Sequence, residues 1–152
     1  MTRAVCSLRR GQRGMTLIEI MVVLVIIAIL GALIGPQLLG QVDSARIKAT
    51  RLDIRSLGTA LDMYQMDNFR YPTTQQGLEA LVKAPESEPV ARNWRPQGYL
   101  KSRTVPKDQW GNDYIYLQPG NHGLPYDLYT LGADGQPGGE DADADIGNWN
   151  ID

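Results

Sequence analysis

The chain has 152 residues and a formal net charge of −2 at pH 7, a size that fits one small domain with an N-terminal extension. Residues 1–14 hold four arginines and no acid, so the remainder has eleven basic residues against seventeen acidic ones and lacks the basic stripe of a nucleic-acid-binding protein. The only cysteine is Cys6, which excludes an intrachain disulfide.

A long apolar run from Met15 to Gly35 follows the basic stretch. Its 21 residues carry one charge, and about 20 apolar residues are enough for a helix to cross a bilayer. A secretory signal peptide is the alternative, but its apolar region has only about 7–15 residues and small-residue cleavage positions after it. We therefore expect a retained single span. The arginines before it predict a cytoplasmic N-terminus and an exported C-terminal region.

Glu19 is the one charged residue of this run. A carboxylate inside a span costs roughly 2.5–3.5 kcal/mol, so it either lies near the headgroups or has a partner. Cleavage between Gly14 and Met15 would create an α-amino group four residues from Glu19. That amine on one subunit would neutralise the glutamate of its neighbour, which would couple processing to assembly through charge balance.

Pro36 comes directly after the apolar run. Proline inside a helix removes one hydrogen bond and kinks or locally melts it, and Gly31 and Gly35 weaken the helix further. Two interpretations remain open for this stretch: it lets the helix extend when packed in a filament, or it forms a simple kink.

The helical pattern continues from Gln37 to about Met66. One line of small and apolar residues recurs every three or four positions, and a second line includes Ile47, Ile54 and Leu61, with charged residues between them. This is the pattern of an amphipathic helix with one face packed on a domain. The first line consists of Leu38, Val42, Ala45, Ala49 and Leu52. We expect one helix over about residues 16–66.

The remaining elements are predicted to be short. Turn-forming residues 67–72 end the long helix, and Thr73 or Thr74 is placed to cap a helix over residues 75–83. Residues 84–96 read as a loop. Residues 113–117 and 126–131 are rich in aromatic and β-branched side chains and predict strands, with a third short strand at residues 99–100.

Five carboxylates crowd a glycine-rich C-terminal stretch, residues 131–150. Ca²⁺ takes six to eight oxygen ligands from carboxylates and carbonyls, and the absence of nearby His and Cys argues against zinc. The spacing does not match an EF-hand, so composition alone leaves a calcium loop and a solvated acidic loop both open. The acids are Asp134, Glu140, Asp141, Asp143 and Asp145.

The sequence shows little that points to catalysis. The only histidine, His122, lies in a glycine-rich turn, where a lone histidine is more often solvent-facing than catalytic. Serine-hydrolase, zinc-protease and P-loop motifs are all missing from the sequence. We therefore expect no enzymatic activity.

Several segments resemble the major pseudopilins of the type II secretion system, the G subunits of the type IV pilin-like superfamily. The hexapeptide Gly14-Met15-Thr16-Leu17-Ile18-Glu19 resembles the prepilin processing signal of that superfamily, and Pro36 falls where many pilin-like helices carry a proline. The body is similar to the pseudopilins at residues 71–78, 93–96, 98–100, 105–108, 110–112 and 131–135. Gln109 and Asp113 differ from the proline that the family often has there.

The resemblance implies an α+β, pilin-like fold. A long N-terminal α-helix, transmembrane in its N-terminal half, would pack on a small antiparallel β-sheet domain with a calcium-binding C-terminal loop. Residues 1–14 would be a cleaved leader, residues 15–36 the transmembrane and assembly segment, and residues 37–152 the periplasmic domain with the second half of the helix. A peptidase would cut after Gly14 and methylate Met15.

The resemblance also implies a function. The chain would be the major structural subunit of a pseudopilus that polymerises in the periplasm and drives the export of folded proteins across the outer membrane. It would be a single-pass protein of the bacterial inner membrane. Its partners would be further copies of itself, minor pseudopilins, the prepilin peptidase and the inner-membrane assembly platform. The alternatives are a type IV pilin for adhesion or motility, which typically has a cysteine-closed loop, and a membrane-anchored binding module that never polymerises.

The pseudopilins bind structural Ca²⁺ in the loop that corresponds to residues 131–150. Carried over to this sequence, carboxylates would come from Asp134 and from Asp141 or Asp143, and carbonyl oxygens from Leu131 and Gln136. Asp145 would be a ligand or an acid that folds the loop.

Overall fold

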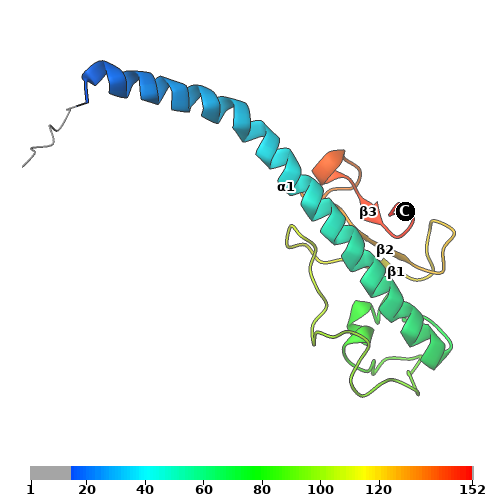
Figure 1. The fold of residues 1–152 in the computed structure, drawn as a ribbon. Coiled ribbons are helices and arrows are strands. Elements are labelled where there is room, and N and C mark those ends of the chain that lie inside the picture. The colour runs from blue at the N-terminus through cyan, green and yellow to red at the C-terminus, as the bar shows by residue number, and fades with distance from the viewer. Residues whose placement is uncertain (1–14, 152) are drawn as a thin grey trace, which may run out of the picture. The chain divides into compact units, whose positions relative to one another are not determined.

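The computed structural model describes residues 15–151 and, within these, every side chain except those of residues 32–39. The chain divides into two compact units, Met1–Leu39 and Gly40–Asp152. Helix α1 (Leu17–Asn68) belongs to both and confirms the long helix predicted over about residues 16–66. The short elements η1, β1, β2, η2 and β3 follow it in the second unit (Figure 1).

Thr16 begins α1. Its hydroxyl accepts a hydrogen bond from the backbone N–H of Glu19 (3.3 Å), and its carbonyl oxygen accepts from the N–H groups of Glu19 and Ile20. Thr16-Leu17-Ile18-Glu19 has the sequence of a capping box, in which a threonine at the helix N-cap is followed three residues later by a glutamate. The helix therefore starts at a defined residue, Leu17, directly after its cap.

The first part of α1 has no core of its own. Every side chain from Met15 to Gly31 is exposed, and large apolar residues dominate this stretch. Over the part of the chain that the structure describes, no helix is both long enough and apolar enough to cross a membrane.

The second unit has a hydrophobic core against one face of α1. Ile54, Leu57, Leu61 and Tyr64 recur every three or four residues and are fully or almost fully buried. Ile54 and Leu61 belong to the second line of apolar residues predicted from the sequence. Ile47, the other member of that line, packs at the edge of the core. Leu52, a member of the first line, is 63% exposed instead.

A three-stranded antiparallel sheet packs in this core. Its strands are β1 (Ile115–Leu117), β2 (Asp127–Thr130) and β3 (Ile146–Gly147), in the order β1-β2-β3. Tyr116 pairs with Leu128, and Thr130 pairs with Ile146. The strand predicted at residues 113–117 is thus confirmed over its last three residues, and the one predicted at residues 126–131 over its central four. The buried residues of the three strands pack in the same core as the buried residues of α1.

Two of the predicted short elements are wrong. Residues 75–83 do not form an α-helix. Thr73 does cap a turn by accepting from the N–H of Gln76 (3.2 Å), but Gly77 has a φ of 58°, which an α-helix cannot accommodate, and only the 3₁₀ turn η1 (Leu78–Leu81) follows. Residues 99–100 are not a strand, because the N–H of Tyr99 bonds to the carbonyl of Leu81. The third strand is β3.

Candidate functional site

The residues predicted for processing and assembly lie at the start and in the middle of α1. Gly14 lies outside the described residues. Met15 is exposed just before the helix, and Glu19 is exposed in its first turn. Pro36 lies inside α1, and its side chain is outside the described part. Met15 and Glu19 are four positions apart in the sequence.

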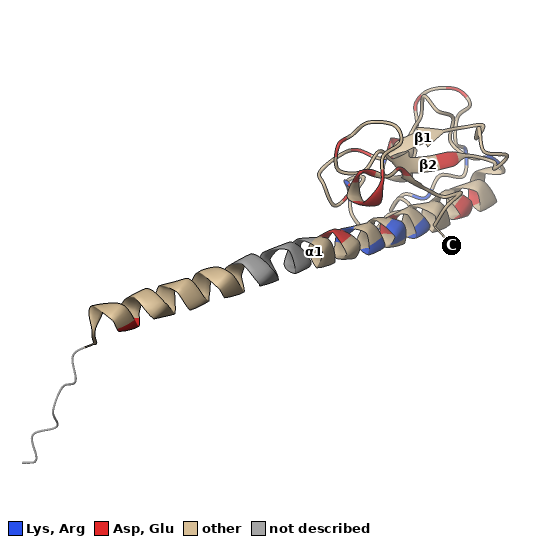
Figure 2. Ribbon diagram, turned by 90° about the horizontal axis from the view of Figure 1, so that it is seen from above, with Lys and Arg blue, Asp and Glu red and all other residues tan. Residues whose placement is uncertain are grey.

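Glu19 has a local structural role that the sequence prediction missed. An acidic side chain in the first turn of a helix interacts favourably with the free backbone N–H groups there, and Thr16 caps the same turn. The signal was available in the sequence, because Thr16 and Glu19 have capping-box spacing. Glu19 is also the only charged residue that Figure 2 shows on α1 before residues 32–39.

The acidic loop connects β2 with β3 and contains the short 3₁₀ helix η2 (Asp141–Asp143). Leu131 directly follows β2. Asp134 accepts a hydrogen bond from the backbone N–H of Gln136 (3.0 Å), which forms a tight turn of the Asx type. Asp141 has a φ of 54°, a value that residues other than glycine seldom adopt.

Backbone contacts fold the loop on itself. The N–H of Ala133 donates to the carbonyl of Ala142 (2.9 Å). Gly132 has a φ of 70°, and a Cβ at this position would lie 2.8 Å from the same carbonyl oxygen. Glycine is thus required here both by the backbone conformation and by the space available.

Asp145 closes the other end of the loop. Its Oδ2 accepts from the N–H of Gly138 (3.0 Å), and its own N–H donates to the carbonyl of Gly138 (3.2 Å). Its Oδ1 is buried without a hydrogen-bond partner in the described structure. Asp145 therefore acts as a loop-folding acid, one of its two predicted roles, and it retains one unpaired carboxylate oxygen.

The predicted metal ligands do not converge as side chains. Asp134, Asp141 and Asp143 are exposed. Between residues 15 and 151, with residues 32–39 excepted, no three His, Cys, Asp or Glu side chains are gathered closely enough to hold a metal ion. Among the same residues no Lys, Arg or His forms an ion pair with an acid of the loop. The loop thus concentrates carboxylates without a protein cation to offset them.

A second segment, residues 107–113, contacts the acidic loop and was not predicted as part of the site. Asp108 is almost fully buried, and its Oδ2 accepts from the Thr130 hydroxyl at 2.5 Å. Asn112 donates from Nδ2 to the carbonyl of Gly132 at 2.9 Å. Sequence reasoning found these residues only through the resemblance to the pseudopilins, because their partners lie about twenty positions away in the sequence.

His122 is exposed, as expected for a turn histidine, and also makes two side-chain contacts. Its Nδ1 lies 2.9 Å from Oδ2 of Asp127, a side chain that is 1% exposed. Its ring stacks on the indole of Trp149, with centroids 3.7 Å apart. These contacts link the β1–β2 connection to the C-terminal segment and are those of a packing residue.

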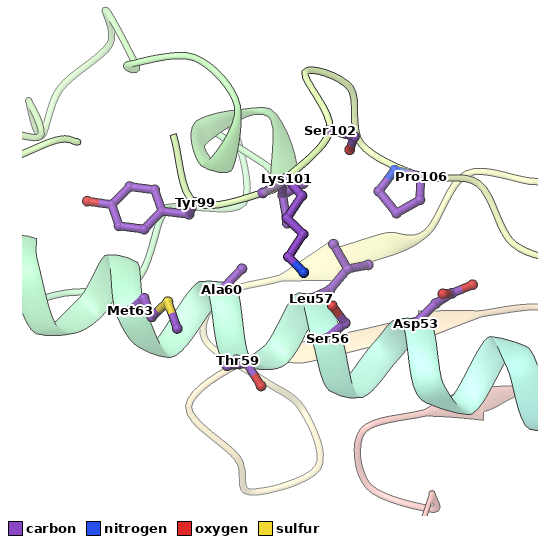
Figure 3. A pocket seen from close by; sticks show the side chains of 11 residues that line it. Asp53, Ser56, Leu57, Thr59, Ala60, Met63, Tyr99, Lys101, Ser102 and Pro106 are labelled. Carbon is purple, nitrogen blue, oxygen red and sulfur yellow. The ribbon is translucent and has the colours of Figure 1, made fainter. Parts of the chain in front are cut away.

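A groove of about 470 Å³ lies between α1 and residues 99–106. Figure 3 shows Lys101 and Pro106 on one wall and Asp53 on the other. Asp53 accepts hydrogen bonds from Gln109 and Tyr114. Burial and then the Asp53 carboxylate raise the pKa of Tyr114. None of the residues predicted for processing, assembly or metal binding lines this groove.

Two family patterns cover almost the whole chain. "Type II secretion system (T2SS), protein G" matches residues 37–149, and "Prokaryotic N-terminal methylation motif" matches residues 9–35. The chain is 58% identical to the type II secretion system core protein G of Pseudomonas aeruginosa, over 93% of this chain and 98% of the relative. It is 56% identical to that of Vibrio cholerae, over 93% of this chain and 94% of the relative.

A solved structure is similar as well. It is the crystal structure of the major pseudopilin from the type 2 secretion system of enterohaemorrhagic Escherichia coli, with a TM-score of 0.64 and 46% sequence identity, over 75% of this chain and 95% of that one. The pilin-like fold and the expectation of a structural, non-enzymatic subunit are thereby confirmed. The chain belongs to the protein G family of the type II secretion system, the major pseudopilins.

Proposed function

We propose that this major pseudopilin polymerises through the first part of α1 into a short periplasmic filament, which pushes folded proteins toward the outer membrane. The supporting observation is that the large apolar residues from Leu17 to Leu30 are all exposed, although the second unit has a core of its own. A continuous apolar surface of this size requires lipid or other protein around it. The helix would be anchored in the inner membrane before assembly and packed against other copies afterwards.

Processing would prepare the chain for assembly. The prepilin peptidase would remove residues 1–14 and methylate Met15, and the minor pseudopilins and the inner-membrane assembly platform would be further partners. The match to the methylation motif supports this proposal. The retained chain would cross the inner membrane once, with its C-terminal domain in the periplasm.

Glu19 would then bind the new α-amino group of a neighbouring copy. Its position in an exposed first turn, four residues after Met15, leaves the carboxylate free for such a contact. In a low-dielectric surrounding an unpaired carboxylate is costly, and pairing it with an amine removes much of that cost. A subunit with an uncut leader would lack the amine and would be excluded from the filament.

Glu19→Gln tests this charge balance, because it keeps the size of the side chain and removes its charge. We expect the mass of the membrane-extracted variant to show loss of residues 1–14 and gain of one methyl group, as in the wild type. Its filaments and its secretion of exoproteins should both be lost. Glu79→Gln, an exposed glutamate in the second unit, is the matched control and should behave like the wild type. Normal filaments from Glu19→Gln would refute the charge-balance proposal.

The mass measurement and a deletion separate the alternatives. A non-polymerising binding module would keep its leader. An adhesive or motility pilin would form surface filaments, and its deletion would leave secretion intact. A processed protein whose deletion blocks secretion supports the pseudopilus.

We also propose that Ca²⁺ binds the acidic loop. The donors available are oxygen atoms of carboxylates and of backbone carbonyls, which Ca²⁺ prefers. Asp145 has a buried oxygen with no hydrogen-bond partner in the described structure, and such an oxygen is costly unless a cation or a donor pairs with it. Leu131, Asp134, Gln136 and Asp141 or Asp143 would hold the ion, and the unpaired oxygen of Asp145 would face it as a further ligand. The bound ion would stabilise the C-terminal part of the domain.

Thermal unfolding with Ca²⁺ and with a chelator tests this proposal. At a free Ca²⁺ concentration 100 times the dissociation constant, we expect stabilisation of about 2.7 kcal/mol. Asp134→Asn should remove most of this increment. Glu140→Gln removes one negative charge from the same loop without removing a proposed ligand, and should retain most of it. A wild-type chain with the same unfolding temperature in Ca²⁺ and in chelator would contradict calcium binding.

A further inference from the structure

One peptide group of the acidic loop is held from both sides. It joins Gly132 to Ala133, between the proposed ligands Leu131 and Asp134. Its carbonyl oxygen accepts from Asn112 Nδ2 at 2.9 Å, and its N–H donates to the carbonyl of Ala142 at 2.9 Å. Two hydrogen bonds in opposite directions fix the plane of this peptide group, and with it the directions of the residues on either side.

Asp108 holds Asn112 in the position that this contact requires. Its Oδ1 accepts from the N–H of Asn112 at 2.7 Å and from the N–H of Trp110 at 3.0 Å, and its own N–H donates to the carbonyl of Asn112 at 2.9 Å. Its other oxygen accepts from Thr130, the last residue of β2. Asp108 thus connects the segment that carries Asn112 directly to the strand that leads into the loop.

From these contacts we infer that Asn112 is a positioning residue for Ca²⁺ in the acidic loop, and that Asp108 is its support. This inference rests on the calcium site proposed above. Asn112 contacts no proposed ligand. It fixes the backbone that presents the Leu131 carbonyl and the Asp134 carboxylate. The loop is rich in glycine, so without this contact its backbone has many conformations to lose when it binds an ion.

Contacts that orient the ligands of a metal typically change metal affinity 10- to 100-fold when they are removed. We therefore expect Asn112→Ala to raise the dissociation constant for Ca²⁺ at least about tenfold. The measurement is a chelator-competition titration of the full-length protein in detergent. The unfolding temperature of each variant is also measured in chelator and in Ca²⁺, and the difference between the two values is compared. A purely structural defect lowers both unfolding temperatures by the same amount, whereas lost positioning reduces the difference between them.

Asn112→Asp gives the sharpest test, because its added negative charge and its lost hydrogen bond predict opposite changes in Ca²⁺ affinity. The substitution keeps the size of the side chain and adds a negative charge beside the loop, which by electrostatic attraction alone would tighten Ca²⁺ binding. It also replaces the donor to the Gly132 carbonyl by an acceptor. We expect weaker binding than in the wild type, and tighter binding would overturn the inference.

Three further variants control for folding and test the role of Asp108. Asn93→Ala removes the same kind of contact elsewhere, an asparagine Nδ2 that donates to the carbonyl of Asp67 at 3.0 Å, and should leave Ca²⁺ affinity unchanged. Asp108→Asn retains an oxygen for the N–H of Asn112, and Thr130 can turn its hydroxyl to accept, so affinity should stay close to that of the wild type. Asp108→Ala should weaken binding as Asn112→Ala does.

The outcomes separate the two proposals. If the wild type and Asn112→Ala bind Ca²⁺ equally tightly, the positioning role is wrong and the calcium site stands. If the wild type binds no Ca²⁺, both proposals are wrong.

Discussion

The guanidinium of Arg95 pairs with the carboxylate of Asp67 through two hydrogen bonds, from Nε at 2.5 Å and from Nη2 at 3.1 Å. Asp67 lies in the last turn of α1, and Arg95 lies in the loop that returns past the helix end. These hydrogen bonds hold the pKa of Asp67 below its usual range, against an opposing effect of burial.

The Asp67–Arg95 ion pair predicts that the stability of the fold decreases at low pH. Because the pKa of Asp67 is lower in the folded chain than in the unfolded one, its contribution is fully present above the usual carboxyl pKa and is lost as the pH falls through the folded value. Asp67→Asn should therefore lower the unfolding temperature at pH 7 and have a progressively smaller effect toward pH 2. A difference from the wild type that is equally large at both ends of this range would exclude the pairing as its cause.

Phe69 predicts a stabilising substitution. It follows α1 directly, has a φ of 61° and is 84% exposed. The left-handed conformation costs residues other than glycine, asparagine and aspartate roughly 1–2 kcal/mol. Phe69→Asn should raise the free energy of unfolding by about 1 kcal/mol, measured by urea denaturation. Phe69→Ala removes the exposed ring and keeps the strain, so a gain of the same size in that control would assign the effect to apolar exposure instead.

Leu61 and Leu52 are two leucines of α1 that differ in their burial and can be compared directly. Leu61 is fully buried in the core, whereas Leu52 is 63% exposed. Leu61→Ala should cost about 2–5 kcal/mol because it leaves a cavity, and Leu52→Ala should change stability by less than about 0.5 kcal/mol. Chemical denaturation of both variants checks which face of α1 is buried and which is exposed. Equal losses would mean that Leu52 is covered in the protein as measured.

The buried tyrosines predict a loss of stability in alkali. Burial, followed by smaller contributions from neighbouring tyrosines, raises the pKa of Tyr116 above its usual range. The unfolded chain therefore releases this proton at a lower pH than the folded chain, and stability should fall as the pH rises above about 10. Thermal unfolding from pH 8 to pH 11 measures the slope.

Tyr116→Phe is the variant for this prediction. It removes the phenol, and with it the hydrogen bond to the Pro72 carbonyl (2.8 Å). We expect a loss of about 1 kcal/mol at neutral pH and a shallower fall in alkali. An unchanged alkaline slope would show that Tyr116 does not contribute to it.

Features that depend on neighbours along the chain could be predicted from the sequence. A 52-residue helix could be predicted because apolar runs and three- to four-residue spacing are local signals, and two strands could be predicted from their composition. The processing signal and the family also came from contiguous motifs, which the comparisons bear out. The capping role of Thr16 was equally local, although the prediction overlooked it.

Features that depend on partners far away in the sequence became visible only in the folded chain. Tyr99 bonds to Leu81 rather than to a strand, and the two-residue strand β3 exists because β2 supplies its partner. Asn112 reaches Gly132 across twenty positions. The residues of such short strands and loops have little intrinsic preference for one backbone conformation. Their stability comes from packing and from hydrogen bonds that form only when the chain has folded.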